Sequence, residues 1–295
     1  MKSVEAGSRI TLNNVLFATD FSPCSNAALP YAVSISRQYG AKLCAAHVVS
    51  SVAYVAVSPE AWPTFAQQEQ QRIQEVEDLE KKLQGIPHSV LTRAGNVWEV
   101  LARLVRENEI DLLVVGTHGR TGLQKLLMGS VAEEIFRKAY CPVLTVGPKV
   151  RFKTEAIPEF KKILFATDFS KDSLVALPYA ISFAEEHDAQ LSLLHVLDRP
   201  AAGSVDLESN ADFLLSRLRD LVPPGIEFWC HPQSFVEYGV PADRILDFAQ
   251  KMGADLIVLG VRPSTTSLDF STHLSRTTAH KVVAHALCPV LTVHG

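Results

Sequence analysis

The residues of this sequence best suited to chemistry are glycines and a cation grouped around one loop. An apolar segment, residues 111–115, runs into Gly116, and the loop that follows contains Gly119 and Arg120. Gly129–Ser130 then begins a segment with helical spacing. Glycine has no Cβ, so a ligand can approach its backbone closely. Ser130 can act as an N-cap, and the first N–H groups of a helix attract anions. This combination predicts a cradle for phosphate.

The spacing of these residues separates the loop from other phosphate-binding patterns. It is neither a P-loop, which needs Gly-Lys-Ser/Thr, nor the GxGxxG of a dinucleotide-binding fold. It resembles the ATP-binding signature of the universal stress protein (UspA) family, G-x2-G-x9-G-[S/T]. The residues that fill its fixed positions are Gly116, Gly119, Gly129 and Ser130. The alternative is that these glycines only serve tight turns.

The chain repeats itself. Residues 16–22 recur letter for letter as residues 164–170, and residues 141–146 recur as residues 288–293. Such self-similarity indicates a tandem duplication. The joint lies near residues 148–158, where charged residues and prolines interrupt the apolar pattern. We therefore expect two domains, residues 1–150 and residues 157–295, the second with a degenerate form of the loop.

In both halves, apolar strands alternate with amphipathic helices, which predicts a parallel sheet built from βαβ units. The expected strands are residues 15–18, 43–49, 90–92, 111–115 and 142–146, then 163–166, 191–197, 227–230, 256–259 and 290–293. A helix should begin at Ser22–Pro23 and end before Gly40. A polar helix over residues 65–83 should bury Ile73, Val76, Leu79 and Leu83.

The resemblance implies more about the fold than the pattern does. It implies two tandem flavodoxin- or Rossmann-like α/β domains, each a five-stranded parallel sheet of order 3-2-1-4-5 with helices on both faces. Strand five of each repeat is an apolar edge that should find a partner. In the family such edges pair across a twofold axis, so the two repeats are expected to form an internal pseudo-dimer.

Ligands of doubly wound sheets bind at the carboxyl ends of the strands, where the strand order reverses. By resemblance, Val48 offers backbone groups to adenine, and Asp20 lies near the nucleoside. The helix start at Gly129, Ser130 and Val131 holds the phosphates, and Mg²⁺ binds together with the nucleotide. Asp20 has an alternative role as partner of the helix start at Ser22. The implied ATP-binding residues are Ala18, Thr19, Asp20, Val48, Val115, Gly116, Gly119, Arg120, Gly129, Ser130 and Val131. Neither catalytic residues nor protein ligands for a metal are expected.

The second half departs from the signature. Gly260 corresponds to Gly116, but Pro263 stands in the place of Gly119, and Gly129–Ser130 aligns best with Arg276–Thr277. Proline has no N–H to donate. We therefore expect the second half to keep the fold and to lose the phosphate cradle. The alternative is that Arg262 and Arg276 bind phosphate through their side chains.

Histidines and cysteines give no sign of a metal site or a disulfide framework. His47 and His195 end strands and are expected to hydrogen-bond a neighbouring loop. Four further histidines of the second half, His273, His280, His285 and His294, are expected to be scattered over the surface. Five cysteines without a C-x-x-C pair suit reduced thiols in the core.

Composition limits the class of protein. A net charge of −4 argues against a dedicated nucleic-acid binder, and neither a secretory signal nor a membrane-spanning segment is visible. The resulting hypothesis is a cytoplasmic tandem universal stress protein that binds ATP in its first domain as a stress-response sensor or regulator. The alternatives are a weak ATPase or nucleotide-transferring enzyme of the same fold, and an interaction module that binds no nucleotide. The sequence does not separate ATP from AMP, and it leaves open a homodimer and an unknown protein partner.

Overall fold

The computed structural model describes residues 9–49, 62–118, 128–150, 158–197, 207–226, 230–262 and 277–295. The elements of the first half are β1 (Asn14–Thr19), α1 (Pro23–Tyr39), β2 (Lys42–Val49), α2 (Trp62–Lys82), β3 (His88–Ala94), α3 (Val97–Glu107), β4 (Leu112–Gly116), α4 (Ser130–Lys138) and β5 (Val143–Val146). Those of the second half are β6 (Lys162–Ala166), α5 (Lys171–Leu174), α6 (Leu177–His187), β7 (Gln190–Leu197), α7 (Leu207–Asp220), β8 (Gln233–Tyr238), α9 (Pro241–Met252), β9 (Leu256–Val261), α10 (Thr278–His285) and β10 (Val290–His294).

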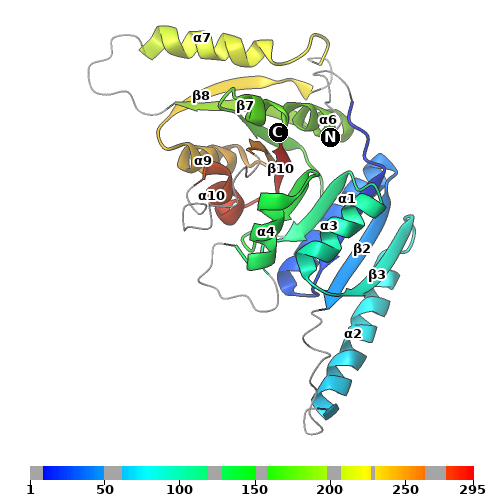
Figure 1. Cartoon of the computed structure of the whole chain (residues 1–295). Coiled ribbons are helices and arrows are strands. Elements are labelled where there is room, and N and C mark those ends of the chain that lie inside the picture. Colours follow the sequence, from blue (N-terminus) through cyan, green and yellow to red (C-terminus); the bar gives the residue numbers. More distant parts are fainter. Residues whose placement is uncertain are drawn as a thin grey trace.

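All ten strands form one sheet, in the order β3-β2-β1-β4-β5-β10-β9-β6-β7-β8 (Figure 1). Within each half the strands are parallel and follow the expected order 3-2-1-4-5. The halves meet where β5 pairs with β10 antiparallel, with Leu144 opposite Leu291. These two leucines occupy the same position in the repeat, so the pairing has a local pseudo-twofold axis. The expected two-domain α/β architecture and the pairing of the strand-five edges are confirmed.

Helices cover both faces of the sheet, as a parallel sheet requires. Along β1, Val15 and Phe17 enter the core beneath α1, whereas Leu16 enters the core beneath α3 and α4. The first of these cores is continuous across the two halves, because α1 packs beside α6 and the Tyr31 and Phe160 rings stack 5.8 Å apart. The carboxyl ends of the strands are therefore fixed along one edge of the sheet, between the two layers of helices.

The first helix begins and ends as its sequence indicates. The Ser22 side chain accepts a hydrogen bond from the Ser25 N–H, and Gly40 ends the helix with a φ of 64°. In the second half the corresponding segment is divided into the short helix α5 and the longer helix α6, with Pro178 in the first turn of α6.

The third strand of the second half is not residues 227–230. The strand β8 lies at Gln233–Tyr238, where it pairs with β7 from Ser192 to Leu197. Ile226 and Cys230 are buried, and the Cys230 N–H donates to the Ile226 carbonyl, whereas residues 227–229 lie outside the described residues. A short apolar run does not distinguish a strand from another buried segment, which explains the wrong prediction.

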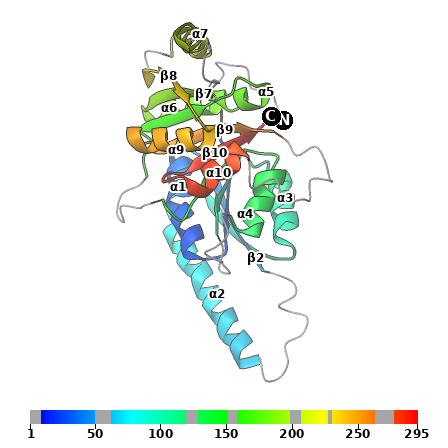
Figure 2. The ribbon, with the colours of Figure 1, turned by 90° about the vertical axis from the view of Figure 1, so that its left-hand side faces the viewer.

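The expected buried stripe of α2 is only half right. Leu79 and Leu83 are buried, Val76 is partly buried, and Ile73 is 44% exposed. Figures 1 and 2 show why: α2 extends away from the body of the molecule, and only its C-terminal end lies against the sheet. The spacing of apolar residues predicts that a helix has an apolar face. It does not predict how much of that face the sheet covers.

The five cysteines are free, as expected, and four of them are buried. Burial raises the pKa of both Cys141 and Cys288 to about 12, so these thiols are unreactive core residues. In the part of the chain that the structure describes, no helix is long and apolar enough to cross a bilayer.

Candidate functional site

Three strand ends and two helix starts meet in the first half, and we call this place the first-half crevice. Thr19 at the end of β1 lies beside His47 of β2, and β4 pairs with β1 on the other side. The end of β4 and the start of α4 lie side by side, because the Gly129 N–H donates to the Thr117 carbonyl over 2.8 Å. The structure therefore brings the predicted residues of β1, β2, β4 and α4 to one edge of the sheet. Gly119 and Arg120 lie outside the described residues.

The turn after β1 is strained and well supported. Phe21 has a φ of 60°, an uncommon value for a residue with a bulky side chain. Its N–H donates to the Thr19 hydroxyl over 3.0 Å, and the Asp20 Oδ1 accepts from the Ser22 N–H over 3.0 Å. His47 Nδ1 bonds the Thr19 carbonyl over 2.9 Å, so the expected role of His47 is confirmed. Asp20 thus has its predicted alternative role at the helix start, where it accepts a hydrogen bond from the Ser22 N–H.

The second half reproduces this turn almost atom for atom. Phe169 has a φ of 61°, and its N–H donates to the Thr167 hydroxyl. Asp168 accepts from the Ser170 N–H over 2.9 Å, and His195 Nδ1 bonds the Thr167 carbonyl over 2.8 Å. Strained residues that recur in one loop are typical of a site whose geometry matters for binding. The repeated letters of residues 16–22 and 164–170 are the sequence signal for it.

Gly116 lacks a Cβ for a reason that the sequence does not reveal. A Cβ there would lie 2.8 Å from the Cys24 carbonyl carbon and oxygen and 2.9 Å from the Ser25 nitrogen. A Cβ at Gly260 would overlap the Asp172 carbonyl oxygen and the backbone of Ser173. In both halves the strand-four glycine is thus required by the backbone of the neighbouring helix. Its presence alone is not evidence of a ligand.

The start of α4 differs by one residue from the prediction. Gly129 is the N-cap, with φ −69° and ψ 152°, and Ser130 is the first helical residue rather than the cap. Gly129 has no side chain, so it cannot satisfy the first N–H groups of the helix. Val131 is 38% exposed, whereas Val115, at the end of β4, is buried. The helix start thus presents backbone and small side chains, as a phosphate cradle requires.

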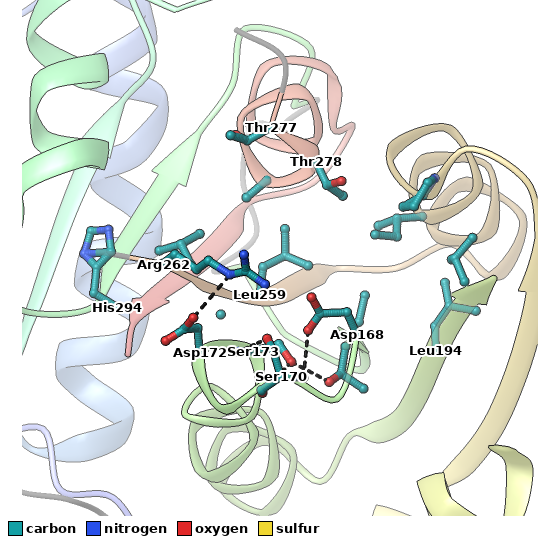
Figure 3. Close-up of a pocket in the computed structure, with 18 of the residues that line it drawn as sticks. Asp168, Ser170, Asp172, Ser173, Leu194, Leu259, Arg262, Thr277, Thr278 and His294 are labelled. Carbon is teal, nitrogen blue, oxygen red and sulfur yellow. Dashed lines mark hydrogen bonds and ion pairs between the residues drawn. The ribbon is translucent and has the colours of Figure 1, made fainter. Parts of the chain in front are cut away.

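A cavity of about 440 Å³ lies at the carboxyl ends of β6, β7 and β9, lined mainly by residues of the second half. We call this cavity the second-half crevice. Figure 3 shows Arg262 next to Asp172 and Ser170 next to Asp168, with Thr277 and Thr278 at the start of α10. Its apolar lining residues include Phe136, Ala166, Leu194, Val196, Ile245 and Leu259.

The polar end of the second-half crevice is dominated by carboxylates. Burial disfavours the charged form of Asp168, but hydrogen bonds from Ser170 and Ser173 and the charge of Arg262 outweigh it and lower the pKa of Asp168. Arg262 Nε lies 3.3 Å from Asp172 Oδ2. This ion pair is largely exposed and contributes little to stability. The ion pair places Arg262 beside Asp172, which occupies the position in the repeat that Cys24 occupies in the first half.

The second-half helix start is already capped. The Thr277 side chain accepts a hydrogen bond from the His280 N–H over 3.2 Å. Thr277 thus occupies the N-cap position that Gly129 occupies in α4, so the predicted alignment of Gly129 with Arg276 is wrong by one residue. Pro263 and Arg276 lie outside the described residues. The two halves share the strand ends and the strained turn but differ at the helix start.

Helix α4 of the first half forms part of the wall of the second-half crevice. Phe136 and Arg137 line the cavity, and His294 of β10 lines it as well. His294 Nδ1 bonds the Ala139 carbonyl over 2.7 Å, and the His280 ring meets the edge of the Phe136 ring, with centroids 6.1 Å apart. These two histidines are buried, so their expected place on the surface is wrong. Sequence reasoning missed this shared wall because its residues meet only through the pairing of β5 with β10.

Among the residues that the structure describes, no three or more His, Cys, Asp or Glu side chains come together as a metal site.

Comparisons with known proteins agree with this architecture. The sequence model described as the universal stress protein family matches residues 11–147, 159–221 and 227–294. Universal stress protein MJ0531 of Methanocaldococcus jannaschii is 30% identical over 136 residues, which cover 45% of this chain and 80% of that protein. A universal stress protein structure from Archaeoglobus fulgidus superposes with a TM-score of 0.71 at 20% identity, covering 96% of this chain and 97% of the other. A functionally unknown protein from Pseudomonas aeruginosa, PA1789, gives a TM-score of 0.60 at 17% identity, covering 96% and 92%. The two structures share the fold, and the sequence match extends over most of both repeats. The chain belongs to the universal stress protein family.

Proposed function

We propose that this chain binds ATP, accompanied by Mg²⁺, in the first-half crevice and acts as a sensor or regulator of the stress response. We assign the nucleotide to a first domain, residues 1–150, and regard residues 157–295 as a second domain without a triphosphate site. Membership of the family supports the stress-related role. The complete G-x2-G-x9-G-[S/T] signature in the first half supports the nucleotide.

The observation that carries the proposal is the difference between two corresponding helix starts. Gly129 leaves the first N–H groups of α4 without a side-chain cap, whereas the Thr277 hydroxyl occupies that position on α10. Uncapped N–H groups at a helix start bind anions, and the helix dipole strengthens the attraction. The hydrogen bond from Gly129 to Thr117 also holds this helix start against the end of β4. A phosphate chain therefore fits the first half better than the second.

The site residues follow the strand ends. Backbone groups of Val48 would meet adenine, and Asp20 would lie near the nucleoside, next to Ala18 and Thr19. Val115, Gly116 and Gly119 would lie along the ribose and the first phosphate. The residues that would hold the remaining phosphates are Arg120, Gly129, Ser130 and Val131. Mg²⁺ would be coordinated by phosphate oxygens and would offset their charge.

The test is the affinity of the intact chain for Mg·ATP, measured by calorimetry, in wild type and in Gly129→Val. Valine readily adopts the φ and ψ of Gly129, so the variant should fold. Its side chain would stand where phosphate approaches. Each charge-assisted hydrogen bond contributes about 1.5–3 kcal/mol, so the affinity should fall roughly ten- to hundredfold.

The matched control is Thr277→Val at the corresponding place in the second half. It removes the cap of α10, which should lower the free energy of unfolding by about 1 kcal/mol without changing the affinity for ATP. We expect one ATP per chain. Two equivalent sites, or an unchanged affinity in Gly129→Val, would refute the proposal.

A further inference from the structure

The outer side of α3 forms a groove with Tyr140, which follows the C-cap of α4. We call it the α3 groove. Figures 1 and 2 show α3 and α4 side by side, and both helices cover the same face of the sheet. Its volume is about 380 Å³, and its lining residues are Trp98, Glu99, Ala102, Arg103, Arg106 and Tyr140.

The side chains of the α3 groove are accessible to a partner. Tyr140 is 72% exposed, and Arg103 and Arg106 are exposed as well. Among the residues that the structure describes, no carboxylate forms an ion pair with either arginine. Arg106 Nε donates to the Ala102 carbonyl over 3.2 Å, which holds this guanidinium along the helix. The groove therefore presents one fully exposed aromatic ring and two cations.

The charges that line the α3 groove favour an acidic partner. Two arginines face one carboxylate, Glu99, which lies in the first turn of α3, where the helix dipole favours a negative charge. The remaining carboxylate of α3, Glu107, does not line the groove. The charged residues of α4 cancel one another: Glu133, Glu134, Arg137 and Lys138. Complementary charge on a partner would therefore be negative.

The duplicated half keeps this helix and lacks the chemistry of the groove. The spacing from the glycine before the helix to the aspartate before the fourth strand is the same in both halves, so the positions correspond directly. Trp98, Arg103, Arg106 and Tyr140 correspond to Ala242, Asp247, Gln250 and Leu287. The fold thus forms without a tryptophan, a tyrosine and two arginines at these places. Exposed aromatic residues that a fold does not require indicate a contact surface.

The shape of the α3 groove favours a protein segment over a small molecule. Ligand pockets bury roughly 70–90% of their ligand, whereas the exposed Tyr140 and Arg103 leave this groove open to solvent. Tryptophan, tyrosine and arginine contribute most of the affinity in protein–protein contacts, and the guanidinium fork matches a carboxylate. We propose that the α3 groove docks an acidic segment of a partner protein. A large apolar side chain of that segment lies against Trp98 and Tyr140, and its carboxylates pair with the two arginines.

The experiment selects peptides from a random library displayed on phage, in parallel against the intact chain and against Arg103→Glu. Arg103 is exposed, so the variant should fold as wild type does. We expect wild type to select sequences in which an aromatic or large aliphatic residue lies beside aspartate or glutamate, and we expect the variant not to select them. The inference is wrong if both proteins select the same sequences, if the selected sequences lack acidic residues, or if none is selected.

One selected peptide, carrying a fluorophore, is then titrated with the intact chain by fluorescence anisotropy. Tyr140→Ser should weaken its binding by at least about tenfold, the loss expected at the centre of a contact. The matched control is Leu287→Ser, which changes the corresponding exposed residue of the second half and should alter the affinity less than about twofold. Equal effects of the two variants would refute the assignment to the α3 groove. Neither variant should change the affinity for Mg·ATP, so this inference and the proposed function fail separately.

A second copy of the chain is the alternative occupant, since α2 carries an exposed Ile73 among several carboxylates. Sedimentation velocity of the intact chain distinguishes the two. Association that increases with concentration and that Arg103→Glu abolishes would assign the groove to self-association and overturn the inference. A monomer, or an association that Arg103→Glu leaves unchanged, supports a separate partner protein.

Discussion

Gly116 ends β4 directly beneath the first turn of α1. The backbone of Cys24 and Ser25 lies so close that only the α-hydrogen of a glycine fits there. Changing Gly116 to alanine would put a methyl group 2.8 Å from the Cys24 carbonyl, which is backbone and cannot rotate away. Overpacking of this kind costs about 1–3 kcal/mol. We therefore expect Gly116→Ala to lower the free energy of unfolding by that amount, measured by chemical denaturation.

The control for this prediction is Gly147→Ala, just beyond β5. A Cβ there would meet its nearest neighbours at 3.7 and 3.8 Å, which is ordinary contact. Gly147→Ala should thus change the free energy of unfolding by less than about 0.5 kcal/mol. Equal losses in both variants would show that the packing against α1 is not what requires Gly116.

Residues whose partners are local could be predicted from the sequence, and residues whose partners are distant could not. Ser22 caps its own helix, and His47 bonds the Thr19 carbonyl at the end of the adjacent strand, so spacing and residue type were sufficient for both. His294 and Ala139 are 155 residues apart, and their contact exists only because β5 pairs with β10. The strand-four glycines fall between these cases, because the sequence shows that a glycine is needed but not what approaches it.

Helix α2 illustrates the same limit for a whole element. Its period predicts one continuous apolar face, but only Leu79 and Leu83 reach the sheet, and Ile73 remains 44% exposed. Leu83→Ala should cost about 2–5 kcal/mol, the usual loss for a buried leucine. Ile73→Ala should cost less than about 0.5 kcal/mol. Comparable losses in thermal or chemical unfolding would mean that the outer turns of α2 are packed in solution.

The contact between α4 and β10 should make the stability of the protein depend on pH. Burial lowers the pKa of His294 below its ordinary value of about 6.5. The unfolded state therefore binds a proton more readily than the folded state as the pH falls below about 6.5, so the free energy of unfolding should decrease there. Above that pH the neutral ring is favoured in both states, and the stability is fully present.

The variant His294→Asn keeps a donor for the Ala139 carbonyl but removes the titrating ring. Burial also lowers the pKa of His187 and His280, so the variant should weaken the pH dependence without abolishing it. The measurement is urea denaturation at pH 7.5 and pH 5.5 for both proteins. An identical loss of stability in the two would show that His294 does not contribute.

The whole molecule combines a symmetric frame with asymmetric chemistry. Strand order, the strained turn and the histidine bond recur in both halves, since each depends on residues that the duplication preserved. The helix starts differ, because Gly129 leaves α4 without a side-chain cap, whereas Thr277 caps α10. A duplicated chain can change one site without disturbing the other, because the frame does not depend on the residues that changed.

The antiparallel pairing of β5 with β10 is what unites the two halves, and removing one half tests it. In residues 1–150 alone, the apolar edge of β5 would lose its partner, and an uncovered apolar edge seeks another strand. Because Leu144 and Leu291 are equivalent in the repeat, a second copy of β5 can replace β10 about the same axis. We expect the isolated half to dimerise or aggregate at micromolar concentration in sedimentation velocity.

The intact chain at equal molarity is the control, since its β5 edge is already covered, and any association it shows must use another surface. If the half-chain and the intact chain both sediment as monomers, the exposed β5 edge does not drive association.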